Sequence, residues 1–84
     1  MPQYHFHVHT TVDARDEEGV EFVDLAAAKA SAVRNVRALA ADEMRYEHRF
    51  SPGHSIEITD ADDKWLHTTR YSDCIEVRLE AKLA

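Results

Sequence analysis

The sequence predicts an α+β fold with the order β-α-β-β, in which one long helix packs on a small sheet. Residues 3–12 alternate between apolar and polar side chains, and residues 25–47 repeat apolar side chains at helical spacing. Residues 55–70 alternate again on both sides of an acidic turn. With 84 residues and 44% hydrophobic content, the chain is expected to form a single domain over residues 1–84.

The first predicted strand has two different faces. Its apolar side chains, which we expect to face the core, are Tyr4, Phe6 and Val8. Its other face carries three imidazoles, at His5, His7 and His9. An acidic loop over residues 13–19 follows, and residues 20–23 are expected to place Val20 and Phe22 under the helix.

The helix is predicted to begin after Asp24, whose carboxylate suits an N-cap. It should end near Glu47, before the helix-stopping residues 51–53. Alanine, the strongest helix former, dominates this segment. The predicted buried stripe consists of Leu25, Ala28, Ala32, Val36, Leu39, Ala40 and Met44, with Val33 on its flank.

A hairpin is predicted from two strands, residues 55–59 and 64–70, joined by the turn at residues 60–63. Leu66 and Thr68 are expected on its core face. A right-handed crossover would make the first strand parallel to the strand at residues 55–59, so that it lies beside the Trp65 strand. The uncovered face of the sheet would then carry His5, His7, His9, Glu57, Trp65 and His67.

The C-terminal part of the chain, residues 72–84, is predicted to be an extension of the domain that forms either an extra strand or a short helix. Residues 75–83 alternate between apolar and charged side chains, which indicates a strand. The spacing of Ile75, Leu79 and Leu83 also fits a helix. The β-branched Ile75 and Val77 favour the strand.

Composition excludes several functional classes. The formal net charge is −6 and the basic residues are dispersed, which disfavours nucleic acid and acidic membrane surfaces as partners. No apolar run approaches the roughly 18 residues of a membrane helix, and no secretory signal is visible. Cys74 is the only cysteine, so an internal disulfide is impossible. A lone thiol without an export signal predicts a cytoplasmic protein.

The histidine row is the candidate metal site. Alternate strand residues lie about 6.5–7 Å apart, so two imidazoles can reach one ion. His67 or Glu57 would complete a zinc, copper or nickel site based on His5, His7 and His9. The alternatives are an ordinary amphipathic sheet face and a dimer interface with stacked rings. Such an interface would act as a pH sensor, because imidazolium ions repel one another below about pH 6.

Pro2 provides an enzymatic alternative. A free N-terminal proline before a β-α-β unit is similar to the tautomerase superfamily, in which that amine is the general base. The chemistry needs a lowered amine pKa, from burial or neighbouring arginines. No arginine stands at a recognisable spacing here, and the acidic loop departs from those enzymes. Cys74 is assigned no role, and residues 60–63 are interpreted as a turn rather than a calcium loop.

Several short motifs together resemble a family of small bacterial proteins described only as a domain of unknown function. They are Met-Pro-x-Tyr-x-Phe-His-Val, Asp-Glu-Glu-Gly-Val-Glu-Phe, Asp-Leu-Ala-Ala-Ala and Ile-Glu-Ile-Thr-Asp. The resemblance covers residues 1–71. It implies an α+β fold and a cytoplasmic context, and it lends no catalytic residue. Because His7 alone of the three strand histidines fits the pattern, the resemblance counts against a metal site common to the family.

The leading hypothesis is therefore a non-enzymatic protein that acts by association. The expected partner is a second copy in a homodimer, or another protein. The predicted contact surface is the uncovered sheet face or an unpaired strand edge. The first alternative is a divalent-metal-binding protein that uses the histidine row. The second is a tautomerase-like enzyme that depends on Pro2.

Overall fold

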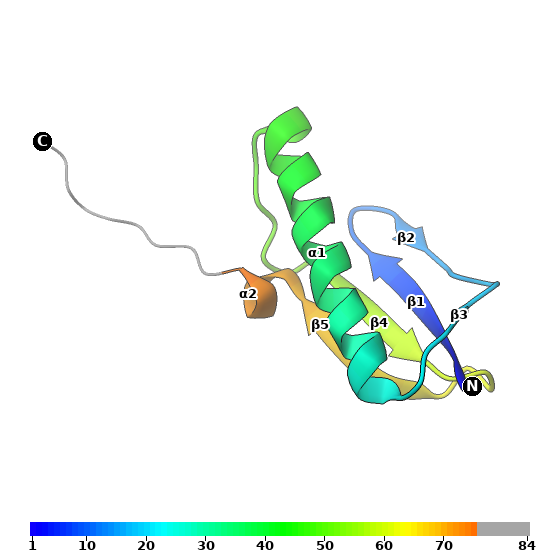
Figure 1. Cartoon of the computed structure of the whole chain (residues 1–84). Coiled ribbons are helices and arrows are strands. Elements are labelled where there is room, and N and C mark those ends of the chain that lie inside the picture. Colours follow the sequence, from blue (N-terminus) through cyan, green and yellow to red (C-terminus); the bar gives the residue numbers. More distant parts are fainter. Residues whose placement is uncertain (76–84) are drawn as a thin grey trace, which may run out of the picture.

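The computed structural model describes residues 1–75, in which one long helix lies across a small antiparallel sheet (Figure 1). The elements are β1 (Gln3–His9), β2 (Asp13–Ala14), β3 (Val20–Glu21), α1 (Leu25–Glu47), β4 (Ser55–Thr59), β5 (Trp65–Arg70) and α2 (Tyr71–Cys74). The α+β class is confirmed. The strand or helix predicted over residues 75–83 lies, apart from Ile75, outside the described residues.

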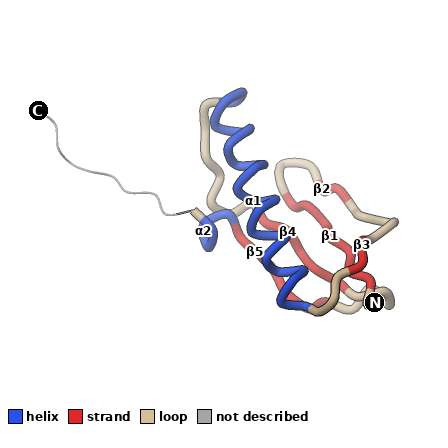
Figure 2. Tube along the Cα trace, in the orientation of Figure 1, coloured by secondary structure: helices blue, strands red, loops and turns tan. Residues whose placement is uncertain are grey.

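The strand order is β2-β1-β4-β5, with β3 also paired to β1, and every pairing is antiparallel. The prediction that β1 runs parallel to β4 and lies beside β5 is therefore wrong. The reason is the return path of the chain. Residues 10–22 come back along β1, and the N–H of Phe22 donates to the carbonyl of Pro2 at 3.1 Å. The helix thus starts beside the beginning of β1. The strand that follows the helix, β4, then runs antiparallel to β1 (Figure 2).

The helix has the predicted bounds, Leu25–Glu47. Oδ1 of Asp24 accepts the N–H of Ala27 at 2.8 Å, as expected of an N-cap. His48, which adopts the left-handed conformation (φ 57°), ends the helix, so the predicted stop at residues 51–53 is not what ends it. The buried stripe is narrower than predicted: Ala28, Ala32, Val36 and Ala40 are buried, whereas Leu39 and Met44 are exposed.

The core lies where α1 packs mainly over β4 and β5. Small alanines let the helix approach the sheet closely, and Ile56 and Ile58 fill the contact. Phe6 packs against both halves of this core. At one end Phe22 closes it, with its ring centroid 5.7 Å from that of Phe6. Val20, predicted to lie under the helix, is 50% exposed.

A β-bulge changes which side chains of β5 face the helix. Ile58 is opposite His67, but the next residue, Thr59, is opposite Trp65, so β5 contains one extra residue at this point. His67 and Thr69 therefore lie on the helix side of the sheet, and Thr68 lies on the uncovered side. The predicted placement of His67 and Thr68 is wrong, because the bulge reverses the alternation, whereas Leu66 packs against the core as predicted. Trp65 stays on the uncovered side, as predicted.

Candidate functional site

The uncovered face of the sheet carries the histidine row in the predicted order. His5, His7 and His9 lie opposite Thr59, Glu57 and Ser55 of β4. The rings of His5 and His7 are stacked, with centroids 6.2 Å apart and planes 6° from parallel. The acidic loop at residues 15–19 folds against this face rather than projecting into solvent, and Asp16 is the residue that attaches it.

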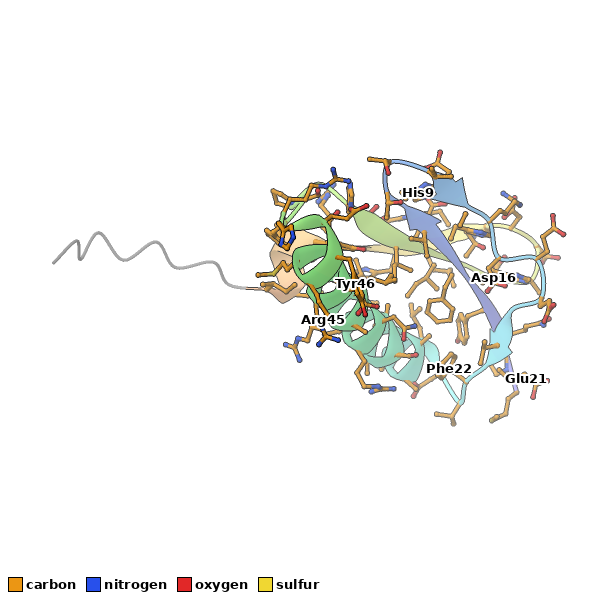
Figure 3. The ribbon with its side chains drawn as sticks, turned by 90° about the horizontal axis from the view of Figure 1, so that it is seen from above. His9, Asp16, Glu21, Phe22, Arg45 and Tyr46 are labelled. Atoms are coloured by element: carbon orange, nitrogen blue, oxygen red, sulfur yellow. The ribbon has the colours of Figure 1, made fainter. Side chains whose placement is uncertain are left out.

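The carboxylate of Asp16 closes a gap in the pairing of β1. The strand pairs with β2 and β3 near its two ends, and between them Oδ2 of Asp16 accepts the N–H of Phe6 at 3.1 Å. Oδ1 accepts the N–H groups of Gly19 at 3.0 Å and Glu18 at 3.2 Å. Burial alone would raise the pKa of Asp16, but these three amides outweigh it and lower the pKa. The loop is thus organised around an ionised carboxylate (Figure 3).

His7 is buried, with 4% of its surface exposed, and uses both ring nitrogens. Nδ1 accepts the N–H of Asp16 at 3.0 Å, and Nε2 lies 2.9 Å from Oγ1 of Thr59. An amide N–H can only donate, so Nδ1 carries no proton and the ring is the neutral Nε2–H tautomer. Nε2 therefore donates to Thr59. Neither nitrogen can take a metal ion or a second proton without breaking one of these hydrogen bonds.

His5 binds the other backbone polar group of Asp16, its carbonyl. Its Nδ1 lies 3.0 Å from the carbonyl of Asp16, and a carbonyl can only accept, so here Nδ1 carries the proton. Both backbone polar groups of Asp16 are therefore bound by imidazoles, and its side chain binds three amides. Gly19 ends this loop with φ +77°, and a Cβ there would lie 3.0 Å from Gln3 and His5.

An ion pair lies beside His7 and borders a small polar cavity. Asp63 adopts a positive φ of 63° at the end of the β4–β5 turn, and its Oδ2 lies 2.7 Å from Arg15. The hydrogen bond from Arg15 lowers the pKa of Asp63, and the same bond raises the pKa of Arg15. The cavity, about 220 Å³, is lined by His5, His7 and these charged groups. Most of its lining is polar, and Arg15, Asp16, Asp60 and Asp63 are already bound to other groups of the protein.

The structure does not bring the predicted metal ligands together. His9 contacts Asp13 at 3.1 Å and lies 3.9 Å from Glu57. His67 lies on the helix side, where burial and then Lys29 lower its pKa. Among residues 1–75, no three His, Cys, Asp or Glu side chains are arranged to hold one metal ion. Metal binding by the histidine row stays a prediction, and it would require rearrangement of the hydrogen bonds of His7.

Pro2, on which the enzymatic alternative rests, precedes β1, and Cys74, which was assigned no role, follows β5. Pro2 is exposed, so its position does not supply the burial that a lowered amine pKa requires. Cys74 lies in α2, where burial raises the pKa of its thiol, although Arg37 opposes that shift.

Over the part of the chain that the structure describes, no helix is long and apolar enough to cross a membrane.

A cluster at the end of α1 was missed by the sequence reasoning. Glu43, with only 9% of its side chain exposed, accepts the N–H and the hydroxyl of Ser51 at 2.9 and 3.2 Å. Nδ1 of His54 lies 3.4 Å from Glu43, and the His54 ring packs edge-on against Tyr71. Burial raises the pKa of Tyr71. These residues are separated in the sequence by 28 positions, and no local periodicity marks their convergence.

The outer edge of β5 differs from that of β1. No strand among residues 1–75 pairs with it. The N–H of Tyr71 donates to the carbonyl of His54 at 2.8 Å. Because antiparallel hydrogen bonding alternates along a strand, Thr69 and His67 bond to β4, whereas the N–H and C=O groups of Thr68 and Arg70 point outward. Trp65, 58% exposed, adjoins this edge and donates from Nε1 to Oγ1 of Thr68 at 2.8 Å.

Comparison with known proteins identifies a family. A family model described as a domain of unknown function (DUF6894) matches residues 3–72, from the start of β1 into α2. No curated protein and no solved structure matches the chain significantly. The matched region includes the histidine row, the Asp16 loop and both edges of the sheet.

Proposed function

We propose, from the premise that the chain belongs to the DUF6894 family of domains of unknown function, that it is a non-enzymatic module that self-associates through β5. The observation that carries the proposal is the outer edge of β5, with which no strand among the described residues 1–75 pairs. Unpaired strand edges are templates for the addition of another strand. The module would thus form a homodimer whose sheet continues from one copy into the next.

A second copy is the occupant that the β5 edge fits. Antiparallel pairing of identical strands obeys two-fold symmetry, which is the commonest arrangement of homodimers. If the two β5 strands pair in a register centred on Thr68, Thr68 of one copy lies opposite Thr68 of the other. Leu66 of each copy then lies opposite Arg70 of the other. This register also keeps Lys64 away from Arg70, so no like charges face one another across the interface. Association would cover part of the exposed Trp65 ring.

The introduction of a charge at Thr68 tests the proposal. The full-length, untagged protein should be a dimer by native mass spectrometry and light scattering. Thr68→Lys and Thr68→Glu should each be monomeric, because two like charges would face one another at the symmetry axis. An equimolar mixture of the two variants should recover the dimer. Thr11→Lys, an exposed change near the opposite edge, is the matched control and should leave the dimer intact.

The outcomes separate the proposal from its alternatives. A monomeric wild type, or dimeric Thr68 variants, would overturn self-association through β5. The same spectrum, recorded on protein purified without chelator, would show one zinc, copper or nickel ion per chain if the histidine row binds metal. Retention of Met1 in the intact mass would dismiss the tautomerase alternative, because Pro2 would not be a free amine.

A further inference from the structure

An apolar groove lies between α1 and β1, on the helix side of the sheet. Because α1 packs mainly over β4 and β5, Phe6 and Val8 of β1 are only partly buried, whereas Tyr4 is buried. The groove has a volume of about 410 Å³. Phe6, Val8 and Ile56 line it from the sheet, Val20 lines one wall, and Leu39 lines the helix wall.

Two apolar residues in the walls of this groove, Val20 and Leu39, are exposed to solvent. Val20 is 50% exposed and Leu39 is 37% exposed, although both belong to segments that the sequence pattern directs toward the core. Leu39 also lines a second cavity of about 310 Å³, where the exposed Tyr46 supplies aromatic surface. The two cavities together follow the helix from Asn35 to Glu47. Exposed apolar surface of this kind indicates a binding site.

The rim of the groove is acidic. Asp16 borders the first cavity, and Asp42, Glu43 and Glu47 border the second. Arg49 also lines the second cavity, where it is bound to Glu47 at 3.0 Å and lies 3.6 Å from Glu43, so its charge offsets one of the three carboxylates there. Asp42 forms no ion pair within residues 1–75, and the helix residues that line the first cavity carry no positive charge.

We propose that this groove binds an amphipathic segment of another protein, one that carries apolar side chains flanked by lysine or arginine. Apolar side chains would fill the floor, and basic ones would meet the acidic rim, the arrangement found where amphipathic helices dock into grooves. A second copy of this chain is a poor occupant, because its net charge of −6 opposes the same rim. Nucleic acid is repelled for the same reason.

A pair of synthetic peptides provides the test. The probe is a 14-residue amphipathic helix built of leucine and lysine, and its counterpart carries glutamate in place of lysine. Isothermal titration against the full-length protein should show saturable 1:1 binding of the leucine–lysine peptide alone. Leu39→Lys should weaken this binding by about tenfold or more, because it places a charge in the apolar wall of the groove.

Met44→Lys is the matched control. It introduces the same charge at a helix residue that is 54% exposed and does not line the groove, so it should leave the affinity unchanged. Leu39→Ser, which removes the apolar contact without adding charge, should also weaken binding and guards against a folding defect in Leu39→Lys. Equal losses in the Leu39→Lys and Met44→Lys variants, or equal binding of the glutamate peptide, would overturn the proposal.

Discussion

The outer edges of β1 and β5 present the same backbone groups, but residues 1–75 complete only the edge of β1. At β1, two short pairings and the Asp16 carboxylate take up the edge, and Asp16 itself is held by His5 and His7. At β5, no segment of residues 1–75 does the same. An edge can thus be closed by a loop organised around one carboxylate, without a full-length strand. The edge that lacks such a loop is the one we propose for self-association.

Removing the Asp16 carboxylate should damage the closed edge most. Asp16→Ala leaves the N–H groups of Phe6, Glu18 and Gly19 without their acceptor, and we expect a loss of about 3 kcal/mol in the free energy of unfolding. Urea denaturation measures this loss, and hydrogen exchange at Phe6 should accelerate. Glu17→Ala, an exposed neighbour, serves as the control. A change within the error of that control would mean that Asp16 does not organise the loop.

His7→Leu should have the next largest effect. The substitution removes the acceptor of the Asp16 N–H and the donor to Thr59 at a buried position, and we expect a loss of about 2 kcal/mol. His9→Leu, at a partly exposed position on the same face, should change the stability little. Thermal and urea unfolding of both variants checks this difference. Equal effects would show that the histidines are interchangeable surface residues.

Acid should weaken the closed edge by a smaller amount. The pKa of Asp16 is lower in the folded protein than in the unfolded chain, so its carboxylate stabilises the fold fully above its ordinary pKa of roughly 3.9. That contribution is lost as the pH falls through the folded-state pKa. The loss should be smaller than that in Asp16→Ala, because a protonated carboxyl group still accepts hydrogen bonds. Urea unfolding from pH 7 to pH 3 should show a shallower decline for Asp16→Ala, and parallel curves would contradict this assignment.

Local patterns were sufficient to predict several parts of this protein. The bounds of α1, its Asp24 cap, the strand β4 and the alternation of His5, His7 and His9 follow from spacing and side-chain chemistry. These features depend on residues only a few positions apart, where a helical or extended backbone dictates which side chains share a face. The resemblance to a domain family of unknown function also depended on such short motifs.

The tertiary structure decided which segments meet. The antiparallel pairing of β1 with β4 depends on the return path of residues 10–22, and the side of the sheet taken by His67 depends on the bulge in β5. The role of Asp16 and the opposite tautomers of His5 and His7 depend on contacts between a loop and a strand up to eleven positions apart. Such contacts leave no periodic signal in the sequence, because each is made once and across a turn whose course the pattern does not specify.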